Sequence, residues 1–141
     1  MHEPDPLDVR LRRLAGFVAV LESPGFVAAT YVRPESEPGV WTMSYPRYHP
    51  EVDRLVALAY EDGWVRGEFD WGAWGKTPEA LALRDDPEAL ASATPDQLAK
   101  LIAVVVRQER FCEGTLAAAF EEGLVLGIVR RAGVLANQEH E

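Results

Sequence analysis

The stretch "RQERFCEG", residues 107–114, carries the charged side chains best placed to do chemistry in this chain. Projected onto the helix predicted for this region, Glu109 falls on the apolar stripe formed by Leu98, Ile102 and Val105. A carboxylate on a core-facing stripe is costly unless it is paired or hydrogen-bonded. The pattern favours a structural ion pair between helices, and its alternative is the charged floor of a binding pocket.

Two arginines lie beside this carboxylate. Arg107 projects to the opposite side of the helix, and Arg110 lies on its flank. A guanidinium can hold a carboxylate or phosphate through two parallel hydrogen bonds, so a small anionic ligand is one expectation for this turn. Glu113 lies four residues after Glu109, where two like charges would destabilise one continuous helix.

No metal site and no cofactor are expected. A pair of glutamates without an inward-facing histidine is a weak metal signal. The histidines are scattered along the chain and two of them lie near its ends: His2, His49 and His140.

The stretch "GEFDWGAWGK", residues 67–76, combines aromatic side chains, glycines and one acid. The glycines let the backbone turn where no helix is expected. Trp71 and Trp74 then cap the helical core, and Asp70 accepts an indole or backbone N–H. The alternative is an aromatic pocket wall in which Asp70 is the polar contact and Tyr45 and Tyr48 form the facing wall.

Material for covalent catalysis is poor, so we assign no catalytic residue. The single cysteine, Cys112, has no histidine near it in the sequence and is expected to be a small core residue. Phosphate-binding glycine loops and nucleophile-elbow motifs are absent from the sequence. The enzymatic alternative is a small hydrolase or transferase that uses Asp70, Glu109 and Glu113 as acid and base.

Composition narrows the function classes. The 141 residues carry a formal charge of −9, which disfavours general binding to nucleic acid. The first residues, "MHEPDPLDVR", lack the apolar region of a signal peptide, and no apolar run approaches the length of a membrane span. We therefore expect a cytoplasmic protein without membrane association.

Proline positions predict where helices begin. Asp5, His49, Thr77, Asp86 and Thr94 each precede a proline, which suits the first position of a helix. Helices are expected at 6–22, 50–62, 94–110, 115–123 and 124–133, with short ones after Thr77 and Asp86. The fold class is mainly α: one compact domain over 1–141 with about five to seven helices, and frayed ends at 1–5 and 136–141.

The segment 23–49 is the exception to this helical pattern. "FVAATYV" and "GVWTMSY" are rich in residues typical of strands, and "RPESEPG" between them resembles a turn. The sequence leaves two alternatives open, a β-hairpin and an irregular packed insert.

A regulator is the weakest alternative. "LAAAFEEGLVLGIVRR", residues 116–131, loosely resembles a helix-turn-helix. Its second helix is mostly apolar, whereas a recognition helix needs polar side chains to read base edges.

Three stretches together resemble a known bacterial family. They are "SYPRYHPEVDRLVALAYEDGWV", "FDWGAW" and "RQERFCEGTLAAAFEEGLVLGIVRR". The chain resembles domain of unknown function number sixty-five-oh-eight over roughly residues 7–135, and "RPESEPG" matches least well. The resemblance implies a small cytoplasmic protein and brings no activity, cofactor or site residue.

These observations favour a non-enzymatic binding module. Its partner would be another protein, a second copy of the chain, or a small anionic ligand. The contacts are expected from the tryptophan-rich loop and from the turn that contains Phe111.

Overall fold

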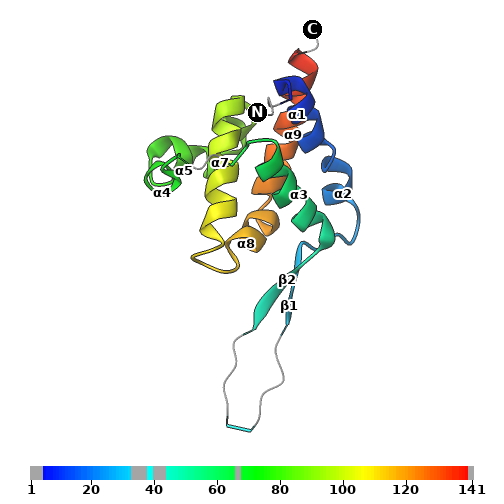
Figure 1. The fold of residues 1–141 in the computed structure, drawn as a ribbon, viewed down its shortest axis with the longest axis vertical. Helices are drawn as coiled ribbons and strands as arrows, with labels where there is room; N and C mark the ends of the chain where they lie inside the picture. Colours follow the sequence, from blue (N-terminus) through cyan, green and yellow to red (C-terminus); the bar gives the residue numbers. More distant parts are fainter. Residues whose placement is uncertain (1–4, 33–37, 40–43, 66–67, 140–141) are drawn as a thin grey trace.

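The computed structural model describes residues 5–32, 38–39, 44–65 and 68–139. It contains helices α1 (Leu7–Ala15), α2 (Val18–Glu22), α3 (Pro50–Glu61), α4 (Trp71–Trp74), α5 (Pro78–Asp85), α6 (Pro87–Ala91), α7 (Pro95–Gln108), α8 (Thr115–Glu121) and α9 (Leu124–Glu139), and strands β1 (Ala29–Val32) and β2 (Tyr45–Tyr48). The mainly helical class is confirmed. The helices form one body from which the hairpin projects, and α1 and the end of α9 lie at the opposite end (Figure 1).

Side-chain caps start α3, α5, α6 and α7 where the prolines predicted helices to begin. Thr94 and Gln97 form both hydrogen bonds of a capping box at α7. Thr77, Asp86 and His49 cap α5, α6 and α3, each by accepting a backbone N–H. At α1 the expected cap is wrong: Pro6 is the N-cap residue without a side-chain bond, and Asp5 instead pairs with Arg13 at 2.6 Å.

The helices α7 and α9 form the centre of the single core. Along α7 the run from Leu101 to Val106 is buried without interruption, which is more than the one stripe predicted. Helix α9 contacts α1, α2, α6, α7 and α8. A helix that is covered on most sides is apolar around most of its circumference. It therefore lacks the separate apolar and polar faces of a helix that lies on the surface.

Two predicted helix bounds are wrong. The helix expected over 6–22 is divided by a turn at Gly16 and Phe17, and both pieces, α1 and α2, contact α9. The helix expected to end at Gly133 continues to Glu139, and Ala136 is buried. A Cβ atom added at Gly133 would meet the Cβ atom of Ala15 at 3.4 Å, an ordinary contact distance, so Gly133 lies where α9 packs against α1 and does not end the helix.

The segment after α2 contains an antiparallel hairpin, one of the two alternatives left open. Ala29 pairs with Tyr48 and Val32 with Tyr45. The second strand was expected in "GVWTMSY" but begins at Tyr45, while residues 40–43 and most of "RPESEPG" lie outside the described part of the chain. Pro46 is tolerated within β2 because each strand of a two-stranded sheet has an unpaired edge.

The tryptophan-rich loop contains a short helix that the sequence did not predict. Asp70 caps α4 by accepting the backbone N–H of Ala73 at 3.1 Å. Gly75 follows the helix in helical backbone geometry, and a Cβ atom added there would lie 3.7 Å from the methyl groups of Val104 on α7. Gly72 lies within α4, which contacts α7, so this glycine does not prevent a helix.

Candidate functional site

The carboxylate of Glu109 joins three elements at the end of α7. Its Oε1 accepts the backbone N–H groups of Gly114 at 2.9 Å and Leu116 at 3.0 Å. Its Oε2 accepts the hydroxyl of Tyr48 on β2 at 2.7 Å. The acid predicted to lie on the core face therefore accepts its hydrogen bonds from N–H groups at the start of α8 and from a phenol. Within the described residues, neither Arg107 nor Arg110 forms an ion pair with it.

This contact changes the acidity of Tyr48. Burial, and then the hydrogen bond and charge of Glu109, raise the pKa of the Tyr48 phenol well above its usual range. The phenol therefore remains a proton donor to Glu109 over the whole physiological range. The pair is suited to fastening the hairpin to the helical body.

The other charges of the turn do not converge on Glu109. Arg110 and Glu113 are exposed, and Arg107 is half-buried rather than turned fully towards solvent. The Nε atom of Arg107 is buried without a hydrogen-bond partner in the described structure. The predicted arginine fork is thus not assembled around the Glu109 carboxylate.

An aromatic pair joins the tryptophan loop to the charged turn. The rings of Trp71 and Phe111 stack with centroids 5.9 Å apart and an interplanar angle of 30°. Trp71 is half-buried, whereas Phe111 is 80% exposed. The two stretches singled out in the sequence therefore meet, through a phenylalanine that was not among the predicted site residues.

Two further tryptophans, Trp64 before the loop and Trp74 within it, pack against the helical body. Trp64 is 2% exposed, with the guanidinium of Arg10 over its ring at 5.4 Å. Trp74 packs against the core, and its indole N–H donates to Glu79 Oε1 at 2.6 Å, which lowers the pKa of Glu79. Trp71 and Trp74 are both half-buried, and of the two it is Trp74 that packs against the core cluster.

The two tyrosines predicted to form one wall lie on opposite faces of the hairpin. In the observed register, Tyr48 shares a face with Tyr31, and Tyr45 shares the other face with Val32. Tyr31 is 57% exposed, and its hydroxyl lies close to Gly114. Tyr31 was missed because only the strand register reveals which face it occupies.

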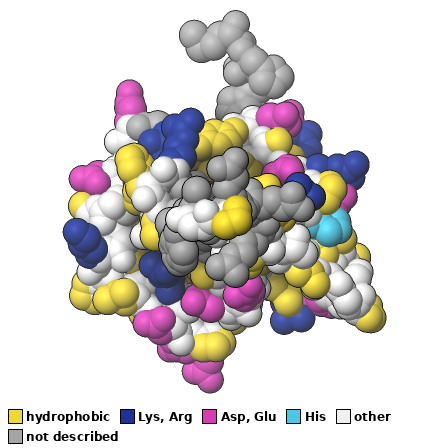
Figure 2. Space-filling model, turned by 90° about the horizontal axis from the view of Figure 1, so that it is seen from below, with side chains coloured by type: hydrophobic (Ala, Val, Ile, Leu, Met, Phe, Trp, Pro, Cys, Tyr) yellow, Lys and Arg dark blue, Asp and Glu magenta, His cyan; other side chains and the backbone are white. Residues whose placement is uncertain are grey.

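We call the surface formed by Tyr31, Trp71 and Phe111 the aromatic patch. Phe111 lies in the turn at 109–114 with Trp71 stacked on it, and the Tyr31 hydroxyl lies near Gly114 at the end of this turn. The same turn carries Glu109, which is bonded to Tyr48, and the exposed Arg110 and Glu113. Figure 2 shows this end of the molecule, where hydrophobic side chains reach the surface around the hairpin beside acidic and basic ones. The one signal in the sequence was an aromatic residue, Phe111, in an otherwise polar turn.

The geometry bears on the two alternative functions. Two of the three carboxylates of the enzymatic alternative, Asp70 and Glu109, hold helix N-termini. The apolar side chains of the second helix of the loose helix-turn-helix, Val125, Ile128 and Val129, are buried in the core and not presented to a groove. These two carboxylates and three apolar side chains therefore have structural roles in the described part of the chain.

The described residues contain neither a candidate metal cluster nor a candidate membrane span. No cluster of three or more His, Cys, Asp or Glu side chains there could hold a metal ion. None of the helices in this part of the chain has both the length and the apolar character needed to cross a membrane.

Comparison with known proteins identifies one family. The model of DUF6508, a family of unknown function, matches residues 6–138. No curated protein and no solved structure matches the chain. The matched range covers the hairpin, the tryptophan loop and the turn at 109–114 together.

Proposed function

This chain belongs to the DUF6508 family, and we propose that it is a binding module that contacts a protein partner through the aromatic patch. The observation that carries the proposal is the exposure of Phe111, of which 80% faces solvent. An exposed apolar side chain indicates an interaction site where others lie beside it, as Trp71 and the 57% exposed Tyr31 do in this patch. Covering it would contribute about 1.5–3 kcal/mol to an association.

The neighbours of Phe111 support this role. The stack on Trp71 restricts the Phe111 ring, so Phe111 would lose little side-chain entropy when a partner covers it. Arg110 and Glu113 are exposed on the same turn and provide charged groups beside the apolar centre. Aromatic anchors with a polar surround are the usual anatomy of protein interfaces.

The hydrogen bonds under the patch support it as well. Glu109 ties Tyr48 to the start of α8, so the hairpin face that carries Tyr31 is held against the turn that carries Phe111. A surface whose parts are already fixed binds with a smaller ordering cost than a flexible one.

Site-specific photo-crosslinking tests the proposal. Phe111 is replaced by photoreactive benzoylphenylalanine in cells of the native host, and the same replacement is made at Tyr60. Tyr60 is a matched control because it is aromatic and 45% exposed, and it lies near the far end of α3, about 15 Å along the helix from the hairpin. We expect one discrete adduct from position 111, whose mass identifies the partner or a second copy of this chain.

A second variant links the adduct to the patch. Trp71→Ala removes the ring that supports position 111 and is expected to reduce the yield of that adduct several-fold. Equal adducts from positions 60 and 111, or none from 111, would contradict the proposal.

A further inference from the structure

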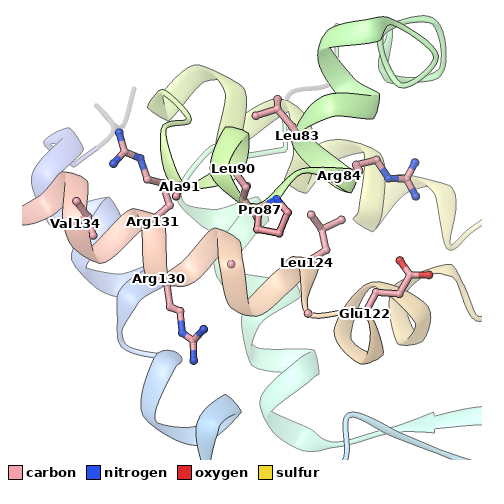
Figure 3. A pocket seen from close by; sticks show the side chains of 12 residues that line it. Leu83, Arg84, Pro87, Leu90, Ala91, Glu122, Leu124, Arg130, Arg131 and Val134 are labelled. Atoms are coloured by element: carbon pink, nitrogen blue, oxygen red, sulfur yellow. The ribbon is translucent and has the colours of Figure 1, made fainter.

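A pocket of about 340 Å³ is lined by residues of α5, α6 and α9, on the side of the molecule where α6 packs against α9 (Figure 3). Its floor is formed by Leu83, Leu90 and Leu124, which are buried leucines from three helices, together with Pro87. Gly127 of α9 allows Leu90 to approach closely, because a Cβ atom there would lie 2.4 Å from Leu90 Cδ2. The volume falls within the range of small-molecule sites.

Charge gathers at the edge of this apolar floor. Arg84, Arg130 and Arg131 line the pocket with one acid, Glu122, although the whole chain has 14 basic and 23 acidic side chains. In Figure 3 the three guanidinium groups leave the floor in different directions, so they form a rim and not a converging fork. The local charge is opposite in sign to that of the protein.

The rim has two unlike ends. Arg84 and Glu122 lie at the same end in Figure 3, where their charges offset each other. Arg131 lies at the other end, and its Nε donates to the carbonyl of Ala93 at 2.8 Å, which orients the guanidinium. Arg130 already pairs with Glu22 through Nε at 2.8 Å. An acid group in the pocket would therefore be held best at the Arg131 end.

We propose that this pocket binds a small amphipathic carboxylate, with its apolar chain on the leucine floor and its acid group at Arg131. At about 30 Å³ for each non-hydrogen atom, the volume that a water molecule takes in the liquid, the pocket accommodates roughly a dozen such atoms. That size corresponds to a carboxylic acid of about eight to ten carbons. The site lies apart from the aromatic patch, so the inference does not depend on the proposed protein partner.

Titration with three straight-chain compounds of eight carbons tests the charge requirement. Octanoate, octanol and octylamine are added to the unaltered protein, and the backbone amides of Gly123 and Gly127 are followed by NMR. We expect saturable shifts with octanoate at a Kd on the order of millimolar, given its few atoms. Octanol is expected to bind about three- to tenfold more weakly, and octylamine more weakly still.

Variants then locate the ligand. Ala91→Trp places a large side chain at an exposed position on the pocket wall and is expected to abolish the shifts without changing the melting temperature. Arg131→Gln should weaken octanoate about tenfold, because a charged hydrogen bond is lost. Arg84→Gln, the matched control at the Glu122 end, should change the affinity less than about twofold.

Three results would overturn different parts of the proposal. Equal binding of octanoate and octanol would overturn the assignment of an acid group, and this comparison uses the unaltered protein alone. Equal effects of Arg131→Gln and Arg84→Gln would overturn its placement. Octanoate shifts that survive Ala91→Trp, or no shifts with the unaltered protein, would overturn the pocket as the binding site.

Discussion

At the end of α7, one carboxylate meets the bonding needs of two other elements. Glu109 accepts two backbone N–H groups at the start of α8 and the hydroxyl of Tyr48 on the hairpin. The first N–H groups of a helix lack partners within the helix, and a carboxylate placed there also interacts favourably with the helix dipole. A residue whose position in the sequence suggested chemistry therefore has a defined structural role.

The substitution Glu109→Gln tests this role at the residue scale. The amide keeps the shape of the side chain but loses the charge that strengthens its three hydrogen bonds, so we expect the free energy of unfolding to fall by about 1–2 kcal/mol. Urea denaturation measures the change. Glu113→Gln is the control on the same exposed turn, and it should change stability by less than about 0.5 kcal/mol. Equal losses of unfolding free energy in both variants would show that the hydrogen bonds of Glu109 do not stabilise the fold more than an exposed charge does.

Titration of Tyr48 gives a second test. Its pKa is raised in the folded protein by burial and by Glu109, so the folded state binds the phenolic proton more tightly than the unfolded state. This contribution to stability is full below about pH 10, the usual pKa of tyrosine, and is lost as the pH rises above it. We expect ultraviolet titration to show one late-ionising tyrosine that disappears in Tyr48→Phe. If Tyr48→Phe instead removed a tyrosine that ionises at lower pH, the contact between Tyr48 and Glu109 would be contradicted.

At the scale of elements, glycines decide how closely the helices around α9 approach. Gly127 and Gly133 both lie inside α9, where alanine is favoured over glycine by about 1 kcal/mol. Their neighbours differ: a Cβ atom at 127 would overlap Leu90 at 2.4 Å, whereas one at 133 would meet Ala15 at 3.4 Å. Packing of α6, and with it the pocket, depends on the first of these glycines.

Alanine substitutions compare the two positions directly. We expect Gly127→Ala to be less stable than Gly133→Ala by at least about 1 kcal/mol, because Leu90 has to move away from the new methyl group. Thermal unfolding of both variants under one condition measures the difference, and the shared gain in helix propensity cancels. Equal melting temperatures would mean that Leu90 adjusts at no cost.

At the scale of the whole molecule, charge opposes contact between copies. The formal charge is −9 at pH 7, and the sequence isoelectric point is about 4.8. Net charge far from zero keeps proteins apart, and the exposed aromatic patch acts in the opposite direction. The balance between the two should shift with pH and salt.

Sedimentation velocity at several pH values tests this balance. We expect self-association to increase as the pH is lowered from 7 towards 4.8, and as salt is added at pH 7, because both reduce repulsion between copies. Phe111→Ser should reduce the increase, and its melting temperature should stay nearly unchanged because the side chain is exposed. Association that is indifferent to this substitution would assign the contact to another surface.

The sequence by itself determined where the long helices begin and that the fold is mainly helical. The capping box of Thr94 and Gln97 and the cap at His49 join residues within three positions of each other, so local chemistry suffices to predict them. Continued helix beyond Gly133 could not be predicted, because a glycine after an apolar run resembles a helix C-terminus, whereas α9 continues along the distant helix α1.

Only the tertiary structure decided which of the candidate residues meet. Glu109 and Tyr48 are separated by 61 positions, and Phe111 finds Trp71 only when the turn after α7 packs beside α4. The split of Tyr45 from Tyr48 follows from strand register, since successive side chains point to opposite faces. Spacing along the chain predicts which residues contact each other within one helix or strand. Contacts between different elements depend on how their apolar faces pack together, which spacing does not show.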